Sequence, residues 1–166
     1  IQMCGIIGYL GQEQCKAILL KGLEQLQNRG YDSAGISLLK EKIHIKKYAS
    51  SEDGNAIQKL KESVKKDSNN GIAHTRWATH GKKNDINSHP HISYDGKISV
   101  VHNGIIENYM VLKKFLNEEG IEFKSETDTE VIPHLIAYHL QETGDIILSL
   151  KKTIYMLEGT WGLAIQ

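Results

Sequence analysis

The sequence predicts a layered α+β fold in which helices pack against groups of strands. Short apolar or alternating runs, typical of strands, occur both in adjacent pairs and separated by helix-length segments. Other segments repeat apolar residues at steps of three and four, which is typical of amphipathic helices. This mixture favours an α+β arrangement over a simple doubly wound parallel sheet.

The first strand is expected at Gly5–Leu10, and the first helix follows over residues 12–28. One face of that helix carries its apolar side chains, which are Cys15, Ile18, Leu19, Leu23 and Leu26. Gly30 follows where a left-handed residue would end the helix. Cys15 is therefore expected in the core.

The other expected strands are Gly35–Leu39, Ile43–Ala49, Ile72–Arg76, Ile98–His102 and Thr160–Ile165. The first strand and the one ending at His102 are rich enough in apolar residues to be central strands, buried on both faces. The polar stretch Lys61–Asn70 is interpreted as a helix end that continues into a surface loop.

Three more helices are expected in the second half of the chain. The first has an apolar face ended by Gly120 and formed by Ile106, Tyr109, Leu112, Phe115 and Leu116. The next follows Thr127-Asp128-Thr129-Glu130, which has the spacing of a capping box, and Pro133 requires it to start just before that proline. The last runs from Asp145 to about Leu157.

Composition excludes several classes of protein. The 166 residues suit a single domain, and 40% hydrophobic residues argue against a disordered chain. Twenty basic and twenty acidic residues balance, so no net charge attracts nucleic acid or anionic lipid. The apolar runs are too short to cross a bilayer, and no secretion signal is evident. Two cysteines cannot form a disulfide framework, which favours a reducing, cytoplasmic location.

Cys4 is the first residue with candidate chemistry, because it stands directly before the first strand. A free cysteine is most often a small buried apolar residue. It can also be a nucleophile whose base is its own α-amino group, provided that the residues before it are removed. From Cys4 alone, the structural interpretation is favoured.

Polar residues cluster where other strands end, which is where layered proteins often place a site. Arg76 could bind a carboxylate through two hydrogen bonds. Asp128 could face a ligand ammonium or, equally, cap a helix. Asn103 and Gly104 offer an amide and an unhindered backbone N–H that could form an oxyanion hole, or a turn with positive φ.

A metal site is the competing chemical hypothesis. Eight histidines are many for this length, and His89 and His91 could share one face of a strand. No carboxylate-rich or HExxH spacing accompanies them, so we expect no metal.

Together these segments resemble the glutaminase domains of the glutamine–fructose-6-phosphate aminotransferase family, which are class II glutamine amidotransferases. The matching strings, in the order of the family, are MCGIIGYLG, NRGYDSAGI, GIAHTRWATHG, HPH, VVHNGIIEN and SETDTEVI. The resemblance implies a four-layer αββα N-terminal-nucleophile hydrolase fold. It also implies hydrolysis of L-glutamine through a thioester on the N-terminal cysteine, with no cofactor.

The resemblance assigns roles to individual residues. Cys4 would be the nucleophile, with Asn103 and Gly104 as the oxyanion hole. Arg76 would bind the α-carboxylate of glutamine and Asp128 its α-ammonium. The pocket would be shaped by Trp77, Thr79 and His80, with Arg29 and His89 in supporting positions.

The chain also departs from the family pattern. Ile1-Gln2-Met3 precede Cys4, so we expect Met3 to be the true start and to be removed. The family domain continues beyond Gln166, so residues 1–166 are expected to be a partial glutaminase domain that lacks the sugar isomerase domain. That domain would be its partner, and a homodimer is expected only for the full-length protein. The alternative is a catalytically inactive domain that binds glutamine or packs against a partner.

Overall fold

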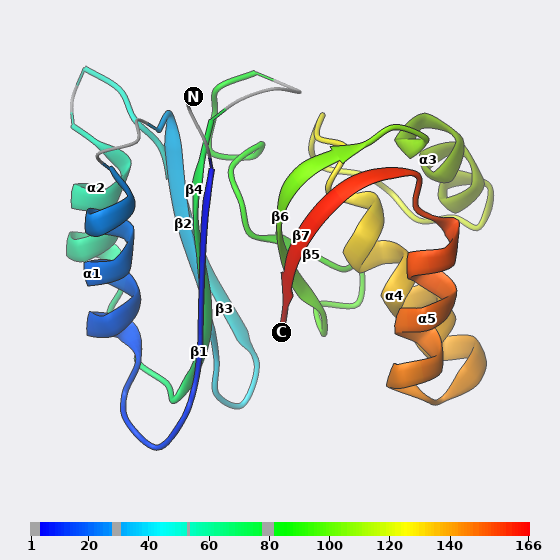
Figure 1. Cartoon of the computed structure of the whole chain (residues 1–166), viewed down its shortest axis with the longest axis horizontal. Helices are drawn as coiled ribbons and strands as arrows, with labels where there is room; N and C mark the ends of the chain where they lie inside the picture. Colours follow the sequence, from blue (N-terminus) through cyan, green and yellow to red (C-terminus); the bar gives the residue numbers. More distant parts are fainter. Residues whose placement is uncertain (1–3, 28–30, 53, 78–81) are drawn as a thin grey trace.

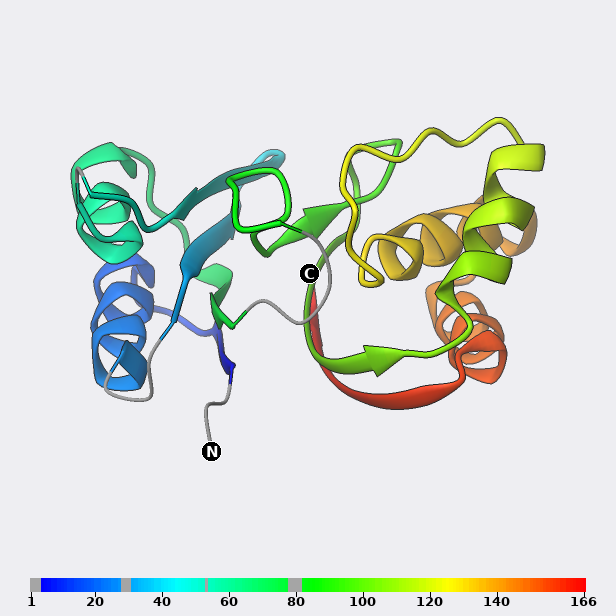
Figure 2. The same ribbon diagram turned by 90° about the horizontal axis from the view of Figure 1, so that it is seen from above.

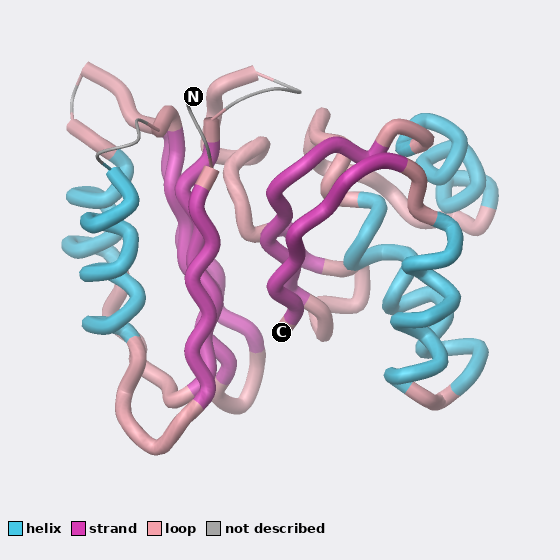
Figure 3. The backbone as a smooth tube through the Cα atoms, in the orientation of Figure 1, coloured by secondary structure: helices cyan, strands magenta, loops and turns pink. Residues whose placement is uncertain are grey.

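Two antiparallel sheets lie face to face in the computed structural model, and helices cover their outer faces (Figure 1). The structure describes residues 4–27, 31–52, 54–77 and 82–166. Viewed by secondary structure, the sheets lie between two groups of helices (Figure 3). The predicted four-layer αββα architecture is confirmed.

The first half of the chain forms one sheet and its helical layer. The sheet has the order β1-β4-β2-β3, with β1 (Gly5–Leu10), β2 (Ser33–Leu39), β3 (Ile43–Ala49) and β4 (Asn70–Arg76). Its outer face is covered by α1 (Lys16–Leu26) and α2 (Ala56–Ser63). The end of α2 at Ser63 confirms the predicted helix end in the 61–70 stretch.

The second half forms the other sheet and the other helical layer (Figure 2). This sheet has the order β5-β6-β7, with β5 (His91–Ile92), β6 (Ser99–Ile106) and β7 (Gly159–Ile165). Its helices are α3 (Tyr109–Glu118), α4 (Val131–Thr143) and α5 (Ile146–Met156). Within the described residues, no helix is both long enough and apolar enough to span a bilayer.

Alternation along the strands separates two apolar cores. In β2, Ala34, Ile36 and Leu38 point toward α1 and α2, where they pack with Leu19 and Leu23. In β6, alternate residues pack instead against α3, α4 and α5. Each sheet therefore contributes one face to a helical core, which leaves its other face for the contact between the sheets.

The layer between the sheets is unusually polar. Ser37 of β2 donates a hydrogen bond to the Gln166 side chain at 2.6 Å, and His74 of β4 contacts Asn103 of β6 at 2.8 Å. Gly35 lies so close to the loop before β5 that an added Cβ would be 2.0 Å from the His89 carbonyl oxygen. Buried polar groups must be paired, so this layer positions side chains by hydrogen bonds as well as by packing.

Helix ends agree well with the sequence signals. Pro133 lies in the first turn of α4, where its missing N–H costs no hydrogen bond. Gly120 follows α3 with φ +81° and Gly144 ends α4 with φ +65°, both in the left-handed region. The Asp145 side chain caps α5 by accepting from the Ile147 and Leu148 N–H groups.

Three element predictions were wrong. Gly5–Leu10 is not a central strand, because β1 pairs with β4 alone among the described strands and every residue of β1 after Gly5 is at least partly exposed. The first helix starts at Lys16 rather than residue 12, and its Ile18 is 38% exposed rather than core. Cys15, immediately before that helix, is fully buried as predicted.

The third error concerns the segment around Asn103. The strand predicted to end at His102 continues to Ile106, so Ile106 belongs to β6 and not to the following helix. The helix starts only at Tyr109. Pairing of Asn103 to Ile106 with β7 supplies the backbone hydrogen bonds that a purely local pattern does not reveal.

Candidate active site

A cavity of about 250 Å3 lies between the two sheets, beside the start of β1 and the end of β4. Its lining comes from both sheets and from the loop before α4. The lining residues are Cys4, His74, Arg76, Trp77, His89, His102, Gly104, Ile105, Thr127, Asp128, Thr129 and Thr160. Residues from six separated segments of the chain thus meet at one place.

Cys4 is half-buried at the edge of this cavity, where β1 begins. Its Sγ accepts a hydrogen bond from the Trp77 N–H at 3.1 Å and lies 3.6 Å from the Trp77 carbonyl oxygen. Burial raises the pKa of the Cys4 thiol, with Asp32 adding to the rise, while the Trp77 hydrogen bond and the Arg76 charge oppose it. The thiol therefore needs a base to become a nucleophile near neutral pH.

Asn103 and Gly104 of β6 lie opposite Cys4. The Asn103 Nδ2 donates to the Cys4 carbonyl oxygen at 3.0 Å, which joins the start of β1 to the second sheet. Gly104 has φ +131°, and a Cβ there would lie 2.0 Å from the Thr160 carbonyl oxygen. Only glycine fits this backbone, and the positive φ expected for an Asn-Gly pair is present, though inside a strand rather than in a turn.

Arg76 ends β4 and is almost fully buried beside the cavity. Burial lowers the pKa of its guanidinium, and the acidic groups Asp32, Cys4 (when it is a thiolate) and Asp128 counter that effect. An arginine stays protonated even so, because its ordinary pKa lies far above neutral pH. The cavity therefore contains a fixed positive charge within electrostatic range of the thiol.

Asp128 reaches the cavity from the loop before α4. Its Oδ2 accepts from the Ile106 N–H at the end of β6, at 2.8 Å. It does not cap α4, so the helix-cap interpretation is wrong. The cavity thus has a carboxylate as well as a guanidinium on its wall.

The capping box predicted at Thr127–Glu130 is also absent. Glu130 is the N-cap residue of α4, and no side chain caps that helix by a hydrogen bond. Instead the Glu130 carboxylate accepts from the Lys124 and Ser125 N–H groups and from the Ser125 hydroxyl. Despite burial, hydrogen bonds from His134 and Ser125 lower the Glu130 pKa to about 2, so this loop is built on an ionised carboxylate.

Two further expected site residues line the cavity in different ways. Trp77 contributes its backbone to Cys4, and its side chain is 36% exposed. His89 is buried, and its Nδ1 accepts from the His102 N–H at 3.3 Å. The expected residues Arg29, Thr79 and His80 lie outside the described residues, as does Gly30.

His74, His102, Thr129 and Thr160 line the same cavity, although the sequence analysis gave them no role. His74 stands two residues before Arg76 on one strand, so both side chains point to the same face. That period-two spacing was a signal available in the sequence. The contributions of Thr129 and Thr160 depend on tertiary contacts and had no such signal.

The buried histidines bind one another and nearby hydroxyl groups. His74 stacks on His89 with ring centroids 4.3 Å apart, and His91 contacts the edge of His89 at 4.9 Å. His102 Nδ1 lies 2.8 Å from the Thr129 hydroxyl. Across the described residues, no group of three or more histidine, cysteine or acidic side chains is placed to hold a metal ion.

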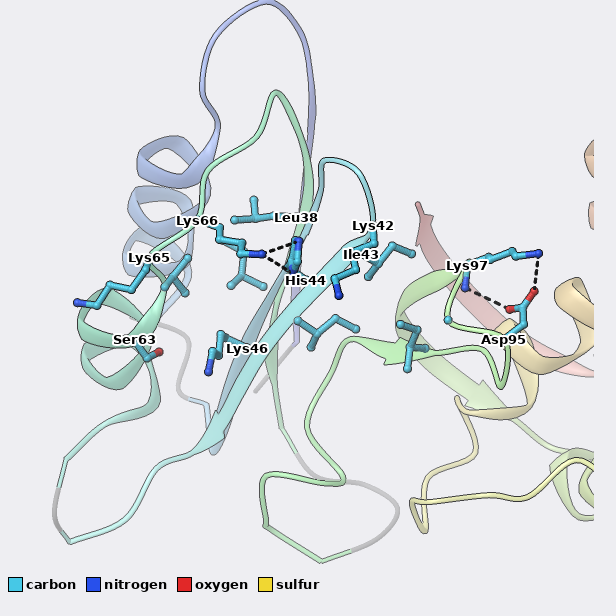
Figure 4. A pocket seen from close by; sticks show the side chains of 15 residues that line it. Leu38, Lys42, Ile43, His44, Lys46, Ser63, Lys65, Lys66, Asp95 and Lys97 are labelled. Carbon is cyan, nitrogen blue, oxygen red and sulfur yellow. Dashed lines mark hydrogen bonds and ion pairs between the residues drawn. The ribbon is translucent and has the colours of Figure 1, made fainter.

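A larger hollow of about 780 Å3 lies elsewhere, between β3, the segment after α2 and the turn at 95–97 (Figure 4). Its charged groups are mostly lysines, with Lys65 and Lys97 at opposite ends of the view. Lys66 contacts His44 and Lys97 pairs with Asp95. It contains no cysteine, so the smaller cavity is the better candidate for nucleophilic chemistry.

The sequence and the fold are similar to those of known proteins. Residues 74–166 match the family described as the glutamine amidotransferase domain. The chain is 52% identical to a glutamine–fructose-6-phosphate aminotransferase (isomerizing) of Caldanaerobacter subterraneus and 47% identical to that of Aquifex aeolicus. Each alignment covers 98% of this chain, which spans only about a quarter of the length of these relatives.

Two solved structures have the same architecture. One is a glutamine phosphoribosylpyrophosphate amidotransferase from Bacillus subtilis, with TM-score 0.77 and 28% identity over 97% of this chain and 34% of that one. The other is an allosteric regulatory enzyme of purine biosynthesis, with TM-score 0.79 and 28% identity over 97% of this chain and 35% of that one. Both similarities extend over nearly all of the present chain.

Proposed function

Because this chain belongs to the glutamine amidotransferase domain family, we propose that it hydrolyses L-glutamine to L-glutamate and ammonia in the cavity at Cys4. The observation that carries the proposal is the meeting of a thiol, a guanidinium, a carboxylate and two candidate oxyanion donors around one small cavity. A volume of about 250 Å3 suits a single amino acid better than a macromolecule.

Glutamine would be held at its amino-acid end by opposite charges. The Arg76 guanidinium would bind the α-carboxylate, and the Asp128 carboxylate, already oriented by the Ile106 N–H, would bind the α-ammonium. Each pairing is a charge-assisted hydrogen bond, which is stronger than a hydrogen bond between neutral groups. A ligand lacking either group would lose one of these bonds, which makes the site selective for amino acids.

The side-chain amide would then lie at Cys4. The Sγ thiolate attacks the amide carbon, and the carbonyl π electrons move to oxygen, which gives a tetrahedral oxyanion. The Asn103 Nδ2 and the Gly104 N–H would donate to that oxygen. As the C–N bond breaks, the nitrogen takes a proton and leaves as ammonia, and a γ-glutamyl thioester remains on Cys4. Water then attacks the thioester, releasing glutamate and restoring the thiol.

The base for the thiol would be the α-amino group of Cys4 itself. Burial raises the thiol pKa, so the thiolate does not form spontaneously at neutral pH. In the sequence as given, Met3 precedes Cys4. The nitrogen of Cys4 is then a peptide amide, which cannot accept a proton. We therefore propose that residues 1–3 are removed in the active protein.

The wider role follows from the names of the relatives. In a full-length protein the ammonia would convert fructose 6-phosphate to glucosamine 6-phosphate, at a sugar isomerase domain outside residues 1–166. That domain is the proposed partner, and the proposed assembly is a homodimer of the full-length protein. A free thiol nucleophile favours a reducing cytoplasm.

The test compares glutamate release by chains that start at Cys4 or at Ile1. We expect turnover from the chain that starts at Cys4 and little or none from the other. Replacing Cys4 by alanine should abolish turnover, whereas Cys15→Ala, which removes the other thiol from the core, should leave it nearly unchanged. A thioester trapped at Cys4 and detected by mass spectrometry would identify the nucleophile.

The alternative function, glutamine binding without turnover, is favoured by the raised pKa of the Cys4 thiol. Calorimetry decides between the two functions. Glutamine binding with no glutamate release from a chain that begins at Cys4 would support the alternative and contradict the proposed hydrolysis.

A further inference from the structure

His74 is a fully buried histidine in the polar layer between the sheets. It comes from β4, and its Nε2 lies 2.8 Å from the Oδ1 of Asn103 in β6. It lines the cavity without being one of the groups assigned to glutamine or to the nucleophile. Its contact with Asn103 is a direct side-chain link between the two sheets at the candidate site.

The hydrogen-bond partners fix the orientation of both side chains. The Cys4 carbonyl oxygen can only accept, so the Asn103 atom that faces it at 3.0 Å must be the Nδ2 donor. The Oδ1 atom of Asn103 is then an acceptor facing His74, so the Nε2 of His74 must carry a proton. Turning the amide over would place two acceptor oxygens against each other.

We propose that His74 is a positioning residue that holds the Asn103 amide in the orientation needed to bind the oxyanion; this rests on the proposed function of the cavity. One hydrogen of the Asn103 NH2 group is used by the Cys4 carbonyl oxygen. The direction of the second hydrogen is then set by the plane of the amide. His74 fixes that plane by its hydrogen bond to the amide oxygen, an arrangement that we call the clamp. Loss of that clamp leaves the amide free to rotate away from the reacting carbonyl.

The same hydrogen bond also strengthens the donor. Donation to Oδ1 draws electron density from the amide and makes its N–H group a better donor, because linked hydrogen bonds polarise one another. A neutral imidazole can perform this role without adding a charge. Burial lowers the pKa of His74 to about 4, so the ring is neutral over the working pH range.

Packing holds the imidazole in place. Its ring stacks on that of His89, with centroids 4.3 Å apart and planes within 16° of parallel. His89 is itself tied to the second sheet, because its Nδ1 accepts from the His102 N–H, adjacent to Asn103. The two stacked rings are therefore both bonded to β6, His74 through the Asn103 side chain and His89 through the His102 N–H.

The first test compares two substitutions in the chain that begins at Cys4. His74→Leu removes the donor, and we expect kcat for glutamine to fall about 10- to 100-fold. KM should change less than about threefold, because Arg76 and Asp128 hold the other end of the substrate. His74→Gln places an amide N–H near the original Nε2, so it should recover most of kcat.

The matched control is His139→Leu, which removes another buried histidine from α4, one whose side-chain partners are Glu142 and Met156 rather than the loop that carries Asp128. It should lower thermal stability without lowering kcat per folded molecule. If His74→Leu keeps kcat, or if the Gln and Leu variants lose it equally, the positioning role is wrong.

A second measurement does not depend on turnover. Nitrogen NMR of the imidazoles should show His74 as the neutral Nε2–H tautomer. The Asn103 side-chain NH2 signals should move in His74→Leu and stay in place in His139→Leu. Observation of the Nδ1–H tautomer would overturn the inference even in an active protein. If the parent chain is inactive but gives the expected spectra, the proposed function is wrong, whereas the hydrogen bond from His74 to Asn103 is supported.

Discussion

The pKa of Cys4 reflects two opposing environments at one atom. Burial disfavours the thiolate, whereas the Trp77 N–H and the Arg76 charge favour it. The net rise keeps the thiol protonated at rest. The proposed nucleophilic role of Cys4 therefore requires a base beside the thiol, and in the proposal that base is the α-amino nitrogen of Cys4 itself.

Asp128 offers a test of how the substrate ammonium is bound. Asp128→Asn keeps an oxygen that can accept from the Ile106 N–H but removes the negative charge. We expect KM for glutamine to rise about 10- to 100-fold, because a charge-assisted hydrogen bond contributes about 1.5–3 kcal/mol. Steady-state kinetics, with melting temperature as the check on folding, measure this.

The control for that variant is Asp145→Asn, which removes a carboxylate from the cap of α5, away from the cavity. It should leave KM unchanged. Equal KM values for Asp128→Asn and the parent would show that Asp128 has a purely structural role at Ile106.

Among single residues, the sequence predicted many of the residues that line the site but not His74, which is proposed to hold Asn103 in place. Cys4, Arg76, Trp77, His89, Gly104 and Asp128 all line one cavity, and Asn103 reaches Cys4 beside it. Their proposed roles in catalysis and binding stay predictions. His74 had no assigned role, because its partner is 29 positions away and nothing in the local pattern links the two.

At the scale of elements, β6 decides the geometry of the candidate oxyanion hole. It continues past Asn103 and Gly104 because β7 pairs with these residues. Gly104 adopts φ +131° within this pairing, which turns its backbone away from the regular strand conformation. An element predicted to end at His102 therefore extends through the site.

Gly104→Ala should disrupt both the strand pairing and the site. The new Cβ would meet the Thr160 carbonyl oxygen at 2.0 Å, and alanine strongly disfavours this φ. We expect a loss of about 2–4 kcal/mol in the free energy of unfolding, together with a large fall in kcat. Urea denaturation and glutamate release measure the two effects.

Gly96→Ala is the control for Gly104→Ala, because it introduces strain from a positive φ without a clash against a neighbouring strand. Gly96 has φ +75°, and no atom lies within 4 Å of an added Cβ. It should cost only about 1 kcal/mol and leave kcat unchanged. If both alanine variants lose the same stability and activity, contact between Gly104 and β7 is not important.

The loop before α4 shows why a local motif can mislead. Thr127–Glu130 has the spacing of a capping box, yet Glu130 bonds backward to Lys124 and Ser125. This arrangement releases Asp128 to reach the Ile106 N–H on another element. Spacing identified the residue types, but competition among nearby donors decided which bonds formed.

At the scale of the whole molecule, the polar layer between the sheets makes stability depend on pH. The pKa of His74 falls from 6.5 to about 4 on burial, and those of His89 and His91 are also lowered well below 6.5. Between pH 6.5 and 4 the unfolded chain binds protons at these residues that the folded chain does not. The free energy of unfolding therefore decreases as the pH falls through this interval, so the folded protein becomes less stable.

We expect His74 alone to contribute a slope of roughly 1 kcal/mol per pH unit near pH 5. Urea denaturation at pH values between 7 and 4 should show a shallower dependence in His74→Phe than in the parent chain. Glu130 acts in a different interval, because its pKa of about 2 means that its contribution is lost only as pH falls below about 4.5. Identical slopes in the two proteins would refute the histidine assignment.

By itself, the sequence determined the fold class, most helix ends and the residue types at the candidate site. These follow from periodicity, from glycines with positive φ and from short motifs, all of which act over a few neighbouring residues. It did not determine that β1 lies at a sheet edge, that β6 continues to Ile106 or that His74 faces Asn103. Only the tertiary structure decided those features, because each depends on which distant strand supplies the hydrogen-bond partner.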